Sequence, residues 1–138
     1  MRLLNKYPFL PAISFFAVIS FLFCLPGNQF PTGRLFSIPN QDKAIHISFF
    51  TTLCLLFSFP LKKKLANVAK IKQWFWIISL TGICYGIAIE FIQKNWIPNR
   101  SFELLDIVAD SVGCLLALLI SYKKLLPAKQ GLKDMQQF

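Results

Sequence analysis

Residues 7 to 33 contain no charged side chain, which makes them the longest of several uncharged runs in this chain of 138 residues. A transmembrane helix needs roughly 20 mostly apolar residues. Phe9 to Leu25 is apolar apart from a proline and two serines, and Pro26-Gly27 ends it. Because no small-x-small cleavage site follows, we expect an uncleaved membrane helix rather than a signal peptide.

Three further apolar runs follow, at residues 44–61, 73–89 and 111–122. The last has only about a dozen residues, too few to cross a bilayer, so its helix must extend back over Asp110 and Asp106. For the same reason the third helix must continue through Glu90 to Gln93. The sequence therefore predicts an all-α membrane protein with four transmembrane helices, at about 8–26, 44–61, 74–93 and 104–122.

Composition supports a membrane protein over the other classes. Hydrophobic residue types make up 55% of the chain and charged types only 15%, with a net charge of +9. Soluble domains carry about 25% charged residues, and disordered chains are far less apolar. A basic chain this apolar is more typical of a membrane protein in contact with lipids than of a nucleic-acid binder. The length predicts a single domain over residues 1–138.

The basic residues predict the orientation. Eleven of the fifteen Lys and Arg lie in the N-terminus, the second loop and the tail, and four lie in the first and third loops. Because cytoplasmic segments are enriched in Lys and Arg, we expect both termini and a tail at 123–138 to be cytoplasmic. The run Lys62-Lys63-Lys64 would contact anionic head groups. The outer loop with Pro31, Gly33 and Pro39 is predicted to be a structured excursion.

Five of the six acidic residues fall on the outer side in this topology. Residues three and four apart share a helix face. This spacing joins polar residues at the outer ends of three helices, namely Asp42 with His46, Glu90 with Gln93, and Asp106 with Asp110. Arg100 lies in the loop between. On the third helix, Gly82 and Gly86 lie on the same face as Glu90 and Gln93. They form a GxxxG pair, which favours close helix packing.

Asp110 is the deepest of these acids and needs a partner, for which His46, Gln93, Arg100 and Lys43 are the candidates. Ionisable clusters inside membranes are functional by default. The alternative is that the same groups only hydrogen-bond helices together.

The chemistry of the cluster suggests two sets of site residues. The candidate catalytic residues are His46, Asp42, Glu90, Asp106 and Asp110, with His46 as general base or metal ligand. The candidate substrate-binding residues are Lys43, Gln93 and Arg100, of which Arg100 and Lys43 would hold an anionic group. Carboxylates with one imidazole favour Mg²⁺ or Mn²⁺ as the cofactor, if a metal is bound. No activated Ser or Cys motif is present, so hydrolysis would use water.

The order of these motifs resembles the VanZ-like family of small bacterial membrane proteins, named for a member associated with teicoplanin resistance. The matching residues are Asp42-Lys43-x-x-His46-x-x-Phe49, Tyr85-Gly86-x-x-x-Glu90-x-x-Gln93, Pro98-x-Arg100 and Asp106-x-x-Ala109-Asp110-x-x-Gly113, within residues 10 to 122. The family pattern usually has Asn where this chain has Asp110. The resemblance implies a four-helix, multi-pass protein of the bacterial cytoplasmic (inner) membrane.

Two functions remain open from the sequence. One is a cell-envelope protein that acts on or binds an envelope lipid or a cell-wall precursor at its outer face, and catalysis is undecided. The other is a non-catalytic protein whose cluster recognises a ligand or partner, or only stabilises helix packing. Ion transport is less well supported, because the acids lie at one end and form no relay across the membrane.

Overall fold

The computed structural model describes residues 6–27, 40–65 and 67–126, and within these residues all regular structure is helical. The prediction of an all-α protein is therefore confirmed. The main helices are α2 (Leu10–Phe23), α3 (Gln41–Ser58), α5 (Val68–Trp96) and α6 (Leu104–Ile120), with a short α4 (Leu61–Lys64) and a π-helical turn (Ser121–Leu125) that extends α6. The predicted outer-loop excursion around Pro31 and most of the predicted tail at 123–138 lie outside the described residues.

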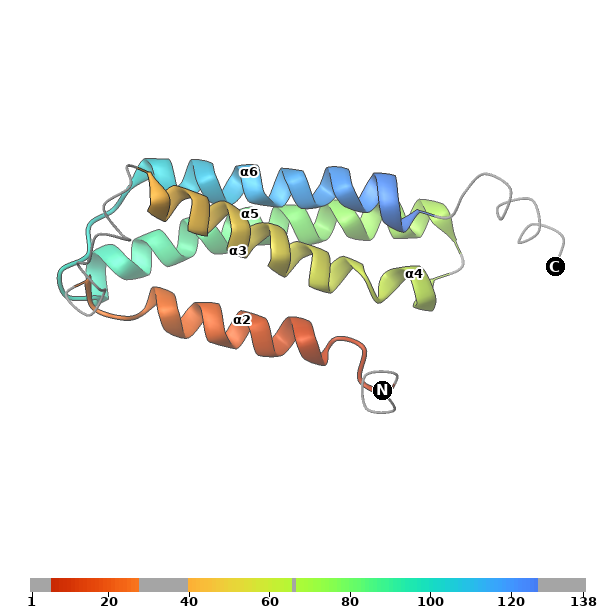
Figure 1. Cartoon of the computed structure of the whole chain (residues 1–138), viewed down its shortest axis with the longest axis horizontal. Coiled ribbons are helices and arrows are strands. Elements are labelled where there is room, and N and C mark those ends of the chain that lie inside the picture. The colour runs from red at the N-terminus through yellow and green to blue at the C-terminus, as the bar shows by residue number, and fades with distance from the viewer. Residues whose placement is uncertain (1–5, 28–39, 66, 127–138) are drawn as a thin grey trace, which may run out of the picture.

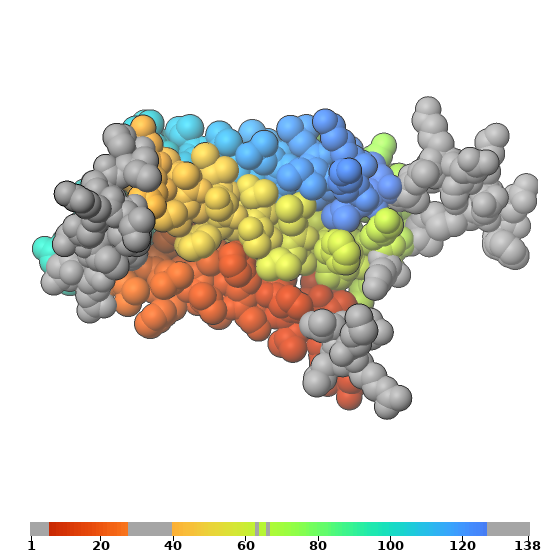
Figure 2. All heavy atoms as spheres, in the orientation of Figure 1, coloured from red at the N-terminus to blue at the C-terminus, as the bar shows by residue number. Residues whose placement is uncertain are grey.

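Helices α3, α5 and α6 pack side by side, and α2 lies along one side of them (Figure 1). Helices α3 and α6 run in the same direction, and α5 runs in the opposite one. The first turns of α3 and α6 therefore meet the last turns of α5 at one end of the bundle. The space-filling view shows α2 against α3 on this face (Figure 2).

Helix α5 begins six residues earlier than the predicted span at 74. Asn67 caps it, because its side-chain oxygen accepts hydrogen bonds from the backbone N–H groups of Ala69 (2.9 Å) and Lys70 (3.2 Å). Lysine is a good helix former. An uncharged run therefore marks the part of a helix that suits a membrane, while the capping residue marks where the helix begins.

Only two helices in the described part of the chain are long and apolar enough to cross a membrane, so four transmembrane helices are not supported. These are α5, with 29 residues, and Leu104–Leu125, with 22 residues. Helix α2 has 14 residues, which span about 21 Å against the ~30 Å of a hydrocarbon core. Helix α3 begins with Gln41, Asp42 and Lys43, which leave it a shorter apolar part than its length suggests.

The buried core lies between α3, α5 and α6, and α2 contributes Ile19 and Phe23 to it. Phe50, Ile89, Cys114 and Ala117 are almost fully buried there. Helix α3 comes close to α6 at Gly113, where a Cβ atom would lie only 2.6 Å from the carbonyl oxygen of Ile47. This close approach brings the polar residues at the start of both helices within reach of one another.

Candidate functional site

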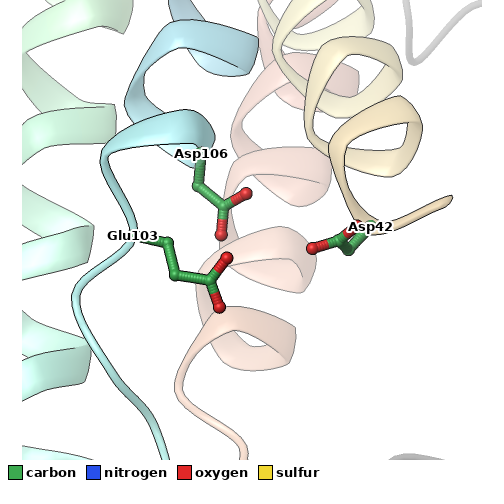
Figure 3. Close-up of side chains that lie close together, drawn as sticks. All are labelled: Asp42, Glu103 and Asp106. Carbon is green, nitrogen blue, oxygen red and sulfur yellow. The ribbon is translucent and has the colours of Figure 1, made fainter. Parts of the chain in front are cut away.

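Lys43 lies among three carboxylates at the end of the bundle where α3 and α6 begin. Its Nζ is 2.6 Å from Asp42, 2.5 Å from Glu103 and 2.6 Å from Asp106. Figure 3 shows that these three carboxylates come from the starts of α3 and α6 and converge. Asp106 is buried, whereas Asp42 and Glu103 are exposed. The ammonium group therefore lies where an exposed acidic rim meets a buried acid.

These contacts shift the pKa values of the residues in the first turn of α3. Burial by itself would lower the pKa of Lys43, but the hydrogen bonds to Asp106, Asp42 and Glu103 outweigh burial and raise it above its ordinary value. Burial by itself would raise the pKa of Asp42, but the hydrogen bond from Lys43 outweighs burial and lowers it. Both groups are therefore held in their charged forms at neutral pH.

His46 lies one turn further along α3, between two carboxylates of α6. Its Nδ1 is 2.8 Å from Asp110 Oδ1, and its Nε2 is 3.8 Å from Asp106 Oδ2. All three residues are buried. Because an ionised carboxylate only accepts hydrogen bonds, an ionised Asp110 keeps a proton on Nδ1 and directs Nε2 toward Asp106. Of the partners predicted for Asp110, the structure selects His46.

Glu90 reaches the site from the end of α5. Its Oε2 accepts a hydrogen bond from the backbone N–H of Glu103 (2.9 Å), directly before α6 begins. A carboxylate at this position stabilises the positive end of the helix dipole. Its second oxygen, Oε1, and the Oδ2 of Asp110 are buried and have no hydrogen-bond partner among the described residues. Two buried acids therefore retain an oxygen that can bind a proton or a ligand.

Gly86 makes room for Asp110 between α5 and α6. A Cβ atom at Gly86 would lie 2.6 Å from Asp110 Oδ2, so any other residue there would push the carboxyl group away. Gly82, one turn earlier, is also buried, against Cys114 and Cys54. The predicted GxxxG stripe is therefore the face of α5 that packs on α6 and α3.

Gln93 and Arg100 contact the C-terminal end of α2. Gln93 Nε2 donates to the carbonyl oxygen of Phe23 (3.0 Å), and Arg100 Nε donates to that of Leu25 (3.5 Å). The N–H of Gly27 donates to the carbonyl of Pro98 (3.2 Å). These bonds fasten α2 so that the Phe23 ring lies over His46, with the ring centroids 4.9 Å apart.

Among the described residues, Asp42, Glu103 and Asp106 have carboxylate oxygens close enough to share a cation, with ligand atoms within 4.8 Å of one another. Lys43 already supplies a positive charge to all three. A Mg²⁺ or Mn²⁺ ion bound there would have to displace this ammonium group. Neither His46 nor Glu90 belongs to this set, so it differs from the alternative in which His46 is a metal ligand.

The structure adds two residues to those expected at the site. Glu103 forms an ion pair with Lys43. Because Glu103 lies three residues before Asp106, the spacing could have predicted that both share one helix face. Phe23 covers His46 from α2, and no local pattern marks it in an apolar helix.

Comparison with known proteins gives one relative. No family model matches the chain, and no solved structure matches it. An uncharacterized protein of the fission yeast Schizosaccharomyces pombe is 35% identical to it over 86 residues, which are 61% of this chain and 48% of the relative. The chain thus spans about half the length of the curated relative that it matches.

These findings contradict the resemblance to the bacterial VanZ-like family. No model of any family matches, and the relative comes from a eukaryote. The individual motifs are short, and polar residues at helix ends recur in membrane proteins for packing reasons. A bacterial source and a link to antibiotic resistance depended on this resemblance and lose their support with it.

Proposed function

We propose that the protein is a multi-pass membrane protein whose buried residues His46, Asp106 and Asp110, together with Lys43, form a functional polar site that acts on or binds a lipid head group at one membrane face. The observation that carries this proposal is His46, buried between two carboxylates, with Nδ1 2.8 Å from Asp110. Ionisable groups in membrane segments are costly, so they are rarely retained without a role.

The membrane location is supported by the apolar surface of the helices. In α5 and α6, the proposed crossing helices, large apolar side chains such as Phe91, Leu104 and Leu119 are more than half exposed. We infer that α2 and α3 lie in the same apolar layer, because Phe21 and Phe59 are similarly exposed. In the proposed topology both termini are on the side of the lysine-rich second loop.

Two single-cysteine variants test this topology. In both, the four native cysteines are first replaced, and one new cysteine is then introduced. Lys72→Cys and Ser101→Cys change exposed residues near opposite ends of the bundle. A membrane-impermeant thiol reagent should label them from opposite sides of sealed vesicles. Labelling of both from the same side would contradict a membrane-crossing α5.

The chemistry we propose for His46 is proton transfer. A histidine whose Nδ1–H is held by a carboxylate can accept a proton at Nε2, and the nearby acids stabilise the imidazolium that results. Since Lys43 is already surrounded by three carboxylates, the site favours a ligand with hydroxyl or cationic groups over an anion. The ligand would approach from the exposed rim of Asp42 and Glu103, because Phe23 covers the other side of His46.

A second function, in which the polar residues act only in helix packing or partner docking, is favoured by Gln93 and Arg100. Both donate to backbone carbonyls at the C-terminal end of α2. Under this alternative, the buried acids and His46 stabilise the bundle without binding a ligand.

Lipid-dependent stability separates the two functions. The full-length protein would be titrated in detergent with lipids that differ only in head group, and its unfolding midpoint measured. A ligand that binds the folded state raises the midpoint with its concentration. We expect stabilisation that depends on the head group and that His46→Gln and Asp106→Asn abolish, while Ser48→Ala, an exposed change on α3, retains it.

If every head group stabilises the wild type and both variants equally, the proposed head-group site is wrong and the packing role is supported. If His46→Gln folds poorly, its circular dichroism reveals this before the titration. Asp106→Asn, which keeps the size of the side chain, then provides the comparison.

A further inference from the structure

An apolar groove runs between α2, α3 and α5, away from the charged residues around His46. Its volume is about 360 Å³, and its lining is almost entirely apolar, with Phe16, Leu53, Phe57, Trp74, Ile78 and Tyr85 among the residues that form it. Figure 1 shows α2 diverging from α5 toward the N-terminal end of α2. Trp74 and Phe16 are exposed, so the groove opens toward the surroundings of the bundle.

One end of the groove is closed. The hydroxyl of Tyr85 on α5 is 2.9 Å from that of Ser20 on α2, which ties the two helices together. The Tyr85 ring also packs against Phe16 (5.0 Å between centroids) and Phe50 (5.7 Å). These contacts separate the groove from His46, so an occupant of the groove does not reach the charged residues.

The other end of the groove, at Phe57 and Trp74, lies toward the end of the bundle that carries the exposed lysines. Lys70 is one helical turn before Trp74 on the same face of α5. Lys64 of α4 places its Nζ 5.2 Å from the ring of Phe9, directly before α2. Every acidic residue in the described part of the chain lies at the opposite end of the bundle. A ligand with an apolar chain and an anionic head would therefore match both the groove and its mouth.

We propose that this groove binds one acyl chain of an anionic phospholipid, whose phosphate lies near Lys64 and Lys70. Charge decides between this occupant and a second copy of the chain. Two copies in the same orientation would bring their lysines together, which is unfavourable, whereas an anionic head group neutralises them. The proposal does not depend on the role of His46, because the groove and the polar site are separated.

Tryptophan quenching by brominated acyl chains tests the proposal. The full-length protein would be reconstituted in phosphatidylcholine vesicles that contain a minor share of brominated lipid. Trp76→Phe with Trp96→Phe leaves Trp74 in the groove, and Trp74→Phe with Trp96→Phe leaves Trp76 as the control. Trp76 is two residues away, about 3 Å along the helix, and is similarly exposed, at 49% against 45% for Trp74.

We expect brominated phosphatidylglycerol to quench Trp74 more strongly than its share of the lipid predicts, and to quench Trp76 only in proportion to that share. Lys64→Gln and Lys70→Gln should each reduce the preference for phosphatidylglycerol at Trp74 by about fivefold. Lys94→Gln, an exposed change at the other end of α5, should leave it unchanged.

Equal quenching of Trp74 and Trp76 would overturn the proposal, because it would reflect ordinary bulk lipid. Loss of Trp74 quenching as the protein-to-lipid ratio rises would also overturn it, since a second copy would then fill the groove. A preference for phosphatidylglycerol that survives both lysine changes would contradict the proposed position of the head group.

Discussion

Lysine has different surroundings at the two ends of this bundle. At the end where α3 and α6 begin, Lys43 is only 15% exposed and contacts Asp42, Glu103 and Asp106. At the opposite end, Lys62, Lys64, Lys70 and Lys72 are all exposed, and no acid of the described chain lies near them. The paired, partly buried Lys43 joins carboxylates from the starts of α3 and α6, whereas the exposed lysines make the opposite surface basic.

The packing beneath the charged end gives the largest expected effect. Gly113→Val would place a side chain against the carbonyl oxygen of Ile47, which cannot move without shifting α3. We expect the free energy of unfolding to fall by about 3 kcal/mol or more, because overpacking forces the backbone to shift. Unfolding followed by circular dichroism would measure this.

Val112→Leu, at the neighbouring exposed position, is the matched control and should change stability little. Equal stability of the Gly113 variant and the wild type would contradict the close approach of α3 and α6.

Removing a single lysine from each end tests the comparison directly. Lys43→Met leaves the buried Asp106 without its ammonium partner. We expect a loss of about 2 kcal/mol, between the ~0–1 kcal/mol of an exposed ion pair and the ~3–5 kcal/mol of a fully buried one. Lys72→Met, at the exposed end, should change stability by less than about 0.5 kcal/mol.

A double variant shows where the lost stability comes from. Adding Asp106→Asn to Lys43→Met should restore part of it, because the stranded buried charge is then removed. If the double variant loses as much as the sum of both single changes, the two residues are not coupled.

The bond that holds α2 over the charged end should have a smaller effect. Gln93→Met keeps the size of the side chain but removes the donor to the carbonyl of Phe23. We expect a loss of about 1 kcal/mol, typical of one buried hydrogen bond. Asn95→Ala, which removes an exposed bond within α5, should cost less, and an equal loss from both would contradict the fastening of α2 by Gln93.

The smallest expected effect is that of pH on the lysine cluster. The raised pKa of Lys43 stabilises the fold below about pH 10, and this stability is lost as the pH rises through the folded-state pKa. The lowered pKa of Asp42 stabilises the fold above about pH 4, and this stability is lost as the pH falls through its folded-state value. The stability difference between wild type and Lys43→Met should therefore stay constant from about pH 5 to pH 9.

Chemical denaturation at several pH values measures that difference. A slope near neutral pH would show that another titrating group, such as His46, contributes to the cluster.

The sequence by itself determined the helical class and the separation of charge between the two ends. A helix satisfies the backbone polar groups of a long apolar run within the run itself, so such runs predict helices. The spacing of Asp106 and Asp110 by four residues also put both on one face of α6. Helix ends were less certain, because they depend on caps such as Asn67 and on lysines that extend a helix beyond its apolar part.

Only the tertiary structure decided which polar groups become partners. From the sequence, Lys43 could have bound an anionic ligand. In the structure α3 and α6 begin at the same end of the bundle, and Lys43 contacts three carboxylates there. Asp110 had four candidate partners, and the space left by Gly86 and the position of α3 select His46. The spacing of residues along one helix determines which side chains share a face of that helix. Which face of a neighbouring helix packs against them depends on contacts between residues far apart in the sequence.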